Sequence, residues 1–140
     1  MPGVQRAAGK NPDFDTLSLS AVLILGRDPN EAAFVWSLVH DVMRADVWLW
    51  HEDDFGHAVQ LLSFCRFRLI LLDSTFGGRL SVGTLVRRIK AVAGATPIIL
   101  RLPPEELPPS LDPRVYGVAD VVPMATGTPT IRAIQRLLSL

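Results

Sequence analysis

The stretch that decides the fold is RLILLDSTFGG, residues 68–78, in which four aliphatic residues run directly into Asp73. A run that is apolar at every position is typical of a strand buried on both faces, as in a parallel sheet covered by helices. In open sheets of this kind, functional groups gather at the carboxyl ends of the strands. The pair Gly77-Gly78 predicts a turn just after the acid. We therefore expect Asp73 to stand at the functional edge of a parallel sheet.

The bulk composition predicts one globular domain. The chain has 140 residues and 49% hydrophobic content, and 14 basic residues balance 14 acidic ones. This balance gives no overall field that would favour nucleic acid or an anionic membrane. The single Cys65 excludes an internal disulfide and a cysteine-based zinc site, and it fits a reducing compartment. No apolar run is long enough to span a membrane, and residues 1–20 lack the apolar block of a signal peptide. We expect a cytoplasmic protein without direct nucleic-acid or membrane partners.

Short apolar segments alternate with segments of helical period along the chain. The predicted strands are residues 20–25, 46–50, 68–73, 96–100 and 118–122. The predicted helices are residues 29–43, 55–64, 81–93 and a last one that begins at Thr128. Five prolines between residues 103 and 116 argue against a regular helix there, apart from a short turn at Asp112–Tyr116. Residues 1–17 show no period and predict a flexible leader before a single domain at 18–140. Five β/α units predict a parallel sheet with helices on both faces.

Four segments carry a resemblance to a known family: LILGRDP, RLILLDSTFGG, TPIILRLP and GVADVVPMA, at the ends of the first, third, fourth and fifth predicted strands. With them, the chain from about residue 20 to residue 138 resembles the receiver domain of bacterial two-component response regulators. The resemblance implies a doubly wound (β/α)5 flavodoxin-like fold with strand order 2-1-3-4-5, and the five prolines predict that its fourth helix is short or disrupted. It also implies that Asp73 is the position at which such domains accept a phosphoryl group.

The partners that the family places around this acid are missing. Gly26 and Arg27 stand at the acidic pair that holds a divalent cation, and only Asp28, one place later, is acidic. The threonine or serine of the fourth strand is replaced by Leu102 with Arg101 beside it, the lysine of the fifth strand by Met124, and the aromatic switch residue by Val121. Because the attacking carboxylate and the phosphate are both anionic, transfer needs a cation between them.

The resemblance and these losses together predict a pseudo-receiver. We expect it to be no enzyme, to need no cofactor, and to regulate an attached or separate output partner by protein contact. A histidine kinase, an output domain or a second copy of the chain are the candidate partners. In this interpretation Asp73 bonds to backbone amides or to Arg27, whose guanidinium could replace the charge of the metal ion.

Two alternatives remain open at this point. The first is a working receiver, in which Asp73 accepts a phosphoryl group from a histidine kinase with Mg²⁺ held by Asp28 and Asp73. The second is a flavodoxin-like binder of a small molecule, which is disfavoured because no glycine-rich phosphate loop follows the first strand.

Other polar and aromatic residues favour structural interpretations. His51, His57 and the acids at 52–54 could be metal ligands, but their spacing matches no strong motif and favours a solvated loop after the second strand. Trp48 and Trp50 share one face of that strand and predict core packing. Cys65 is expected to be an inert, small apolar residue.

Overall fold

A six-stranded sheet forms the centre of the molecule. The computed structural model describes residues 3–6, 21–43, 48–107 and 112–138. The strands are β1 (Gly3–Arg6), β2 (Ala21–Leu25), β3 (Trp48–Glu52), β4 (Leu69–Asp73), β5 (Ile98–Leu102) and β6 (Asp120–Pro123). Their order is β1-β3-β2-β4-β5-β6, and every pair from β3 to β6 is parallel. Counted from Ala21, the parallel strands follow the order 2-1-3-4-5, which confirms the predicted fold class.

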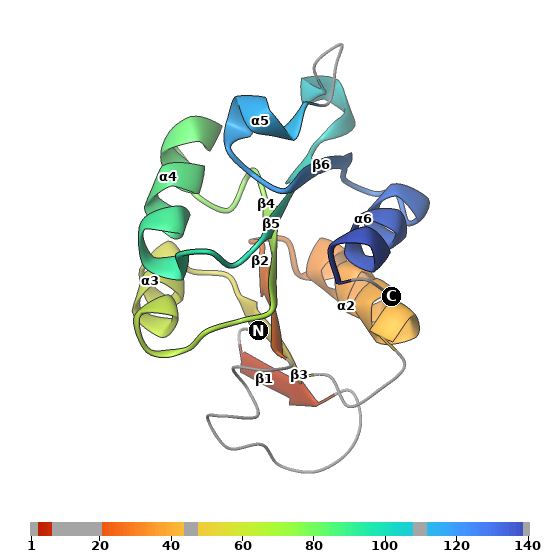
Figure 1. The fold of residues 1–140 in the computed structure, drawn as a ribbon, viewed down its shortest axis with the longest axis horizontal. Helices are drawn as coiled ribbons and strands as arrows, with labels where there is room; N and C mark the ends of the chain where they lie inside the picture. Colours follow the sequence, from red (N-terminus) through yellow and green to blue (C-terminus); the bar gives the residue numbers. More distant parts are fainter. Residues whose placement is uncertain (1–2, 7–20, 44–47, 108–111, 139–140) are drawn as a thin grey trace.

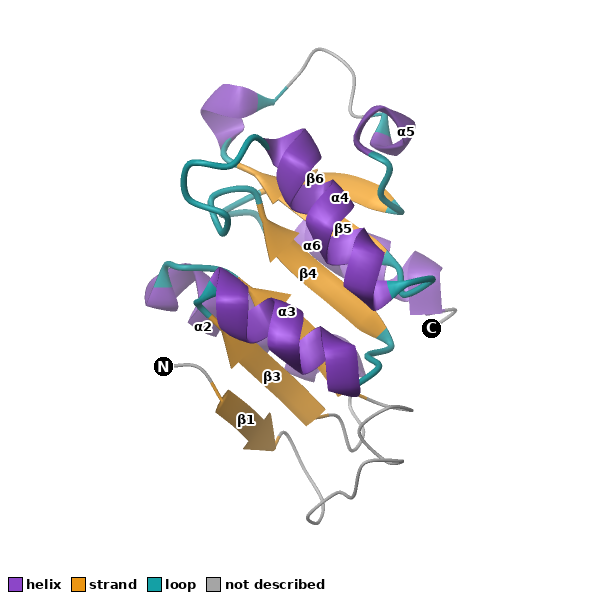
Figure 2. Cartoon of the chain, turned by 90° about the vertical axis from the view of Figure 1, so that its left-hand side faces the viewer, coloured by secondary structure: helices purple, strands orange, loops and turns teal. Residues whose placement is uncertain are grey.

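Helices cover both faces of the sheet. They are α2 (Pro29–Met43), α3 (Phe55–Phe64), α4 (Val82–Ala93), α5 (Pro113–Tyr116) and α6 (Thr128–Leu138), with a 3-10 turn η1 (Pro104–Glu106). The α3 and α4 helices lie on one face, and α2 and α6 lie on the other (Figures 1 and 2). Within the described ranges, no helix is both long and apolar enough to cross a membrane.

Local capping explains where several helices begin. The Asp54 carboxylate accepts a hydrogen bond from the His57 amide at 2.9 Å, and Ser81 accepts one from the Thr84 amide at 3.2 Å. Each side chain satisfies an amide that has no partner inside its helix. Between β5 and β6 the described residues form only η1 and the four-residue α5. The predicted disruption of the fourth helix by prolines is therefore confirmed there.

The core consists of two layers separated by the sheet. Ile70 and Leu72 of β4 pack in the α3/α4 layer, and Leu69 and Leu71 pack in the α2/α6 layer. Such a residue contributes about 1.5–3 kcal/mol when it is fully buried. Since successive side chains of a strand alternate between the faces, Asp73, which follows Leu72, belongs to the α2/α6 side.

The prediction of a flexible leader over residues 1–17 is wrong for four residues. Gly3–Arg6 form β1, which pairs antiparallel with β3 so that Val4 stands opposite Trp50. Without β1, β3 would be the edge of the parallel sheet, with a row of unpaired backbone groups that an extended segment can satisfy. Residues 7–17 lie outside the described part of the chain.

Two strands end two residues later than predicted. His51 and Glu52 belong to β3 and are buried, so they do not form the solvated loop that the sequence suggested. The ladder with β2 continues through Leu25, opposite Glu52, and His51 Nε2 lies 2.9 Å from the carbonyl oxygen of Gly26. The β5 strand likewise includes Arg101. Trp48 and Trp50 do face one layer together, as predicted.

Candidate functional site

The candidate site is centred on Asp73 at the carboxyl end of β4. The residue is only 2% exposed. In the parallel pair of β4 and β5, Asp73 stands opposite Arg101. Paired residues of neighbouring strands project to the same face of a sheet, and Arg101 Nη1 donates a hydrogen bond to Asp73 Oδ1 at 3.2 Å. The register of two strands therefore places a guanidinium beside the acid.

A second carboxylate lies on the other side of this guanidinium. The Arg101 side chain is fully buried, and its Nη2 atom lies 2.7 Å from Oε1 of Glu31 in the first turn of α2. This contact is an ion pair. We call Asp73, Arg101 and Glu31 the triad, in which Asp73 and Arg101 are buried and the Glu31 side chain is 14% exposed. Because two acids share one base, the triad carries one excess negative charge when all three groups are ionised.

Glu31 also connects the triad to the loop after β6. The Ala125 amide donates a hydrogen bond to Glu31 Oε1 at 3.0 Å. Ala125 has a positive φ of 63°, a conformation that costs a residue other than glycine about 1 kcal/mol or more. The bond to Glu31 offsets part of this cost. The triad thus joins β4, β5, the start of α2 and the β6–α6 loop.

Gly26 leaves the space that the Asp73 carboxylate occupies. A Cβ atom on Gly26 would lie 2.7 Å from Asp73 Oδ2, which is too close for non-bonded atoms. An acidic side chain at this position would have to displace the Asp73 carboxylate or move the end of β2. The glycine and the buried acid therefore fit each other.

Burial dominates the electrostatics of Asp73. Loss of solvent raises the pKa of Asp73 from 3.8 to about 6, and the negative charges of Glu31 and Asp28 act in the same direction. The positive charge of Arg101 and its hydrogen bond to the carboxylate lower the pKa but do not cancel these effects. Asp73 therefore binds a proton more tightly than an ordinary aspartate does.

The predicted pairing of Arg27 with Asp73 is wrong. Arg27 is exposed, and within the described part of the chain it forms no ion pair with Asp73. The Nη1 atom of Arg27 instead lies 2.8 Å from the place that a Cβ on Gly78 would take. Arg101 takes the position beside the acid because it lies inside the neighbouring strand, whereas Arg27 follows the end of β2.

The other predicted site residues surround this edge without bringing polar groups to Asp73. Asp28 is exposed and accepts a hydrogen bond from the Asn30 amide at 2.9 Å, which places it at the start of α2. Leu102 and Val121 are buried in the α3/α4 layer. Met124 is half-buried, and its amide donates to the Leu102 carbonyl oxygen at 2.8 Å.

The side chains around Asp73 do not fit a divalent cation. Mg²⁺ needs several oxygen ligands in octahedral geometry, but Asp73 and Glu31 are both engaged by Arg101. Among the described residues, no three or more His, Cys, Asp or Glu side chains are grouped so that they could hold a metal ion. A buried guanidinium would also repel the ion at short range.

Sequence reasoning missed the roles of Arg101 and Glu31. The signal for Arg101 was present, because an arginine inside the apolar run IILRL must find an acid if the run is a buried strand. The signal for Glu31 was weak. An acid in the first turn of a helix is already explained by the helix dipole.

The comparisons with known proteins support the fold. Neither a protein-family model nor a curated protein matches the sequence. Solved structures do match. The chain resembles the receiver domain of a sensor histidine kinase from Pseudomonas aeruginosa PAO1, which has magnesium in its active-site cleft, with a TM-score of 0.68, 17% identity, and coverage of 86% of this chain and 98% of the other.

Two further structures agree. A putative response regulator from Chloroflexus aurantiacus gives a TM-score of 0.70 at 13% identity, over 86% of this chain and 98% of the other. The N-terminal domain of a response regulator/sensory box/GGDEF protein from Carboxydothermus hydrogenoformans gives 0.67 at 16% identity, over 86% and 94%. The receiver fold inferred from the sequence is thus confirmed, at identities that establish the fold alone.

Proposed function

We propose that this chain is a receiver-like signalling module that is not phosphorylated and that regulates an attached or separate partner by protein contact. The observation that carries the proposal is the buried guanidinium of Arg101, which lies between Asp73 and Glu31. It supplies a fixed positive charge at the acid, where phosphoryl transfer would need an exchangeable cation.

The triad favours one arrangement of the site. It ties the ends of β4 and β5 to α2 and, through Glu31, to the β6–α6 loop. A module held in this way needs no phosphoryl group to fix the loop, and we propose that it acts as a constitutive binding surface. In this proposal the chain is no enzyme, has no resident cofactor and works in the cytoplasm.

The proposed partners are a histidine kinase, an output domain or a second copy of the chain. The short α5 offers one contact surface for them, because Val115 is 75% exposed there. An apolar side chain exposed in this way is removed from water when a partner covers it, which favours binding. The prolines that shorten this region make the surface differ from a regular helix.

The alternative is a receiver that accepts a phosphoryl group on Asp73, with Mg²⁺ held by Asp28 and Asp73. The position of Asp73 at the end of β4 supports it, as does the magnesium in the cleft of the Pseudomonas domain. This alternative requires Arg101 to leave Asp73, which would abandon a buried charge pair.

Exposure to a small phosphodonor separates the two functions. The full chain is incubated with acetyl phosphate and Mg²⁺, and the intact mass is compared with that of Asp73→Asn and of the control Asp53→Asn. We expect no phosphorylated species in any of the three proteins. A phosphorylated species in the wild type and in Asp53→Asn, but not in Asp73→Asn, would overturn the proposal and establish the alternative.

A further inference from the structure

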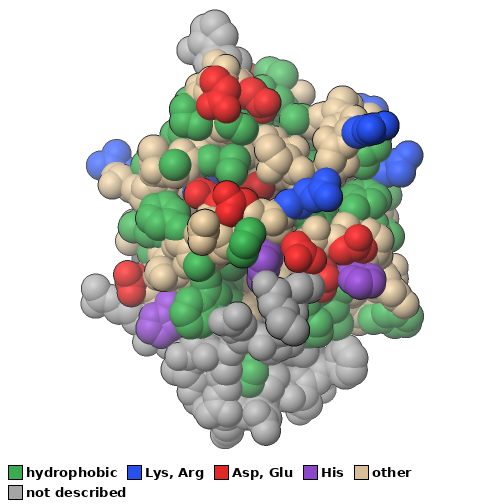
Figure 3. All heavy atoms as spheres, turned by 180° about the vertical axis from the view of Figure 1, so that it is seen from behind, with side chains coloured by type: hydrophobic (Ala, Val, Ile, Leu, Met, Phe, Trp, Pro, Cys, Tyr) green, Lys and Arg blue, Asp and Glu red, His purple; other side chains and the backbone are tan. Residues whose placement is uncertain are grey.

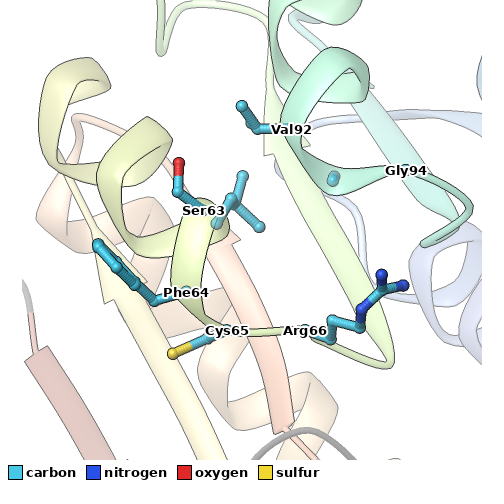
Figure 4. Close-up of a pocket in the computed structure, with 8 residues that line it drawn as sticks. Ser63, Phe64, Cys65, Arg66, Val92 and Gly94 are labelled. Carbon is cyan, nitrogen blue, oxygen red and sulfur yellow. The ribbon is translucent and has the colours of Figure 1, made fainter.

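A shallow groove lies between β3 and α3, away from the triad. It has a volume of about 360 Å³ and is lined by Trp50, Glu52, His57, Gln60, Leu61 and Phe64, together with Cys65. Figure 4 shows that the side chains of Phe64 and Cys65 point away from Val92 of α4. The same two residues also line a second hollow, between the end of α3 and the end of α4.

Glu52 places a poorly solvated carboxylate in this groove. Its side chain is only 9% exposed. Its polar partners are Trp50 Nε1, which donates to Oε2 at 3.3 Å, and His57 Nδ1, 3.6 Å from Oε1. Among the side chains that the structure describes, those of residues 21–43, 48–107 and 112–138, no lysine or arginine pairs with it. A carboxylate that is shielded from water is stabilised when a cation binds beside it, because the ion pair replaces the interactions with water that burial has removed.

The surrounding surface suits a flat cation with an apolar stem. The Trp50 ring is fixed edge-to-face against Phe67, with centroids 6.4 Å apart and an interplanar angle of 87°. Phe64 is 75% exposed at the opposite border and is not needed for the core. Aromatic faces attract guanidinium groups, and apolar side chains can hold the methylene stem of an arginine.

The charge around the groove is also favourable. On the α3 side of the molecule, Figure 3 shows Asp and Glu side chains next to a His side chain. Asp54 is exposed at the start of α3, and its Oδ2 atom lies 3.8 Å from His57 Nδ1. An approaching cation therefore meets acids both at the border of the groove and inside it.

We infer that this groove binds an arginine side chain of a partner polypeptide, with the guanidinium paired to Glu52 and stacked on Trp50. Arginine is preferred to lysine because only its planar, delocalised cation can stack on the ring and pair with the carboxylate at the same time. The inference rests on the proposed function as a protein-binding module, and it specifies the chemistry of the partner.

The test is a titration of the full chain with N-acetyl-arginine amide. The ¹H–¹⁵N signal of the Trp50 indole, assigned with Trp50→Phe, reports binding because this N–H donates to Glu52. We expect saturable shifts with a dissociation constant on the order of 1 mM, as for a ligand of this size. The citrulline analogue, which has the same shape without the charge, should bind at least about fivefold more weakly.

Variants locate the site. Glu52→Gln should weaken binding at least about fivefold, and Phe64→Ala about threefold. Asp53→Asn removes the same charge one residue away from the groove and should leave binding within error. Thermal melting checks that each variant is folded, and Phe64→Ala remains informative if Glu52→Gln is not, because Phe64 is exposed.

Several outcomes would overturn the inference. These are no saturable shift of the Trp50 signal, equal binding of the citrulline analogue, or equal losses from Glu52→Gln and Asp53→Asn. A shift that grows with protein concentration alone would assign the groove to a second copy of the chain. The phosphorylation assay on Asp73 has a different readout, so either result can fail while the other stands.

Discussion

Replacement of Asp73 by asparagine should change the pH dependence of folding by a predictable amount. The pKa of Asp73 is raised from 3.8 to about 6 by burial. One pKa unit corresponds to about 1.36 kcal/mol. Ionisation of Asp73 therefore lowers the stability of the folded state by roughly 3 kcal/mol at a pH well above 6. Asparagine has a similar shape and no proton to gain or lose in this range. The variant therefore lacks this contribution.

The direction in which pH changes the stability depends on which state, folded or unfolded, binds the Asp73 proton more tightly. The folded state holds the Asp73 proton more tightly than the unfolded state does, so folding takes up a proton between pH 3.8 and about 6. This contribution to stability is fully present below pH 3.8 and is lost as the pH rises through about 6. Between roughly pH 4.5 and pH 7, wild type should lose about 2 kcal/mol relative to Asp73→Asn.

Urea unfolding of both proteins across this pH range measures the effect. The quantity to follow is the difference in free energy of unfolding between them, because the other titrating groups largely cancel in it. The carboxyl ¹³C signal of Asp73 should titrate with a midpoint near 6 in the folded protein. A difference that does not depend on pH, or one that favours wild type as the pH rises, would refute the reasoning about burial.

Three further substitutions test the contacts of the site. Arg101→Met removes the buried base shared by Asp73 and Glu31 and should lower the free energy of unfolding at pH 7 by about 3–5 kcal/mol in urea, whereas Arg87→Met, on an exposed helix face, should change it by less than about 0.5 kcal/mol. Gly26→Ala forces a Cβ to within 2.7 Å of the triad carboxylate and should cost about 1–3 kcal/mol in the same assay. Glu31→Gln should speed hydrogen exchange at the Ala125 amide, and unchanged exchange there would show that the bond to Glu31 does not hold the loop.

The features predictable from sequence were those that repeat along the chain. Buried runs such as Leu69–Leu72 and the apolar stripe of α4 have periods that follow from strand and helix geometry, and their alternation implies a parallel sheet. The proline-rich segment was predictable because each ring removes a donor. By contrast, Gly3–Arg6 is too short to show a period, and its strand depends on the free edge of β3.

The partner of Asp73 could not be predicted because it depends on strand register. The sequence places Arg27 two residues after the end of β2 and Arg101 near the end of β5, and both positions are close to the functional edge. Only the pairing of Asp73 with Arg101 in the ladder decides which guanidinium enters the sheet. The strand was predicted to end at residue 100, one residue before Arg101. The backbone ladder continues past that point, with Glu31 supplying the second acid.

Gly26, Arg101 and Glu31 depend on one another, and this explains why no single substitution should restore a cation site. An acid at position 26 would collide with the Asp73 carboxylate as Arg101 now holds it. Removal of Arg101 alone would leave the buried Asp73 and the partly buried Glu31 without a countercharge, which favours protonation of Asp73. A cation site would need both changes, with Glu31 released from the β6–α6 loop as well. The folded protein instead balances the acid internally with an arginine, and the one negative charge left over is matched by a proton near pH 6.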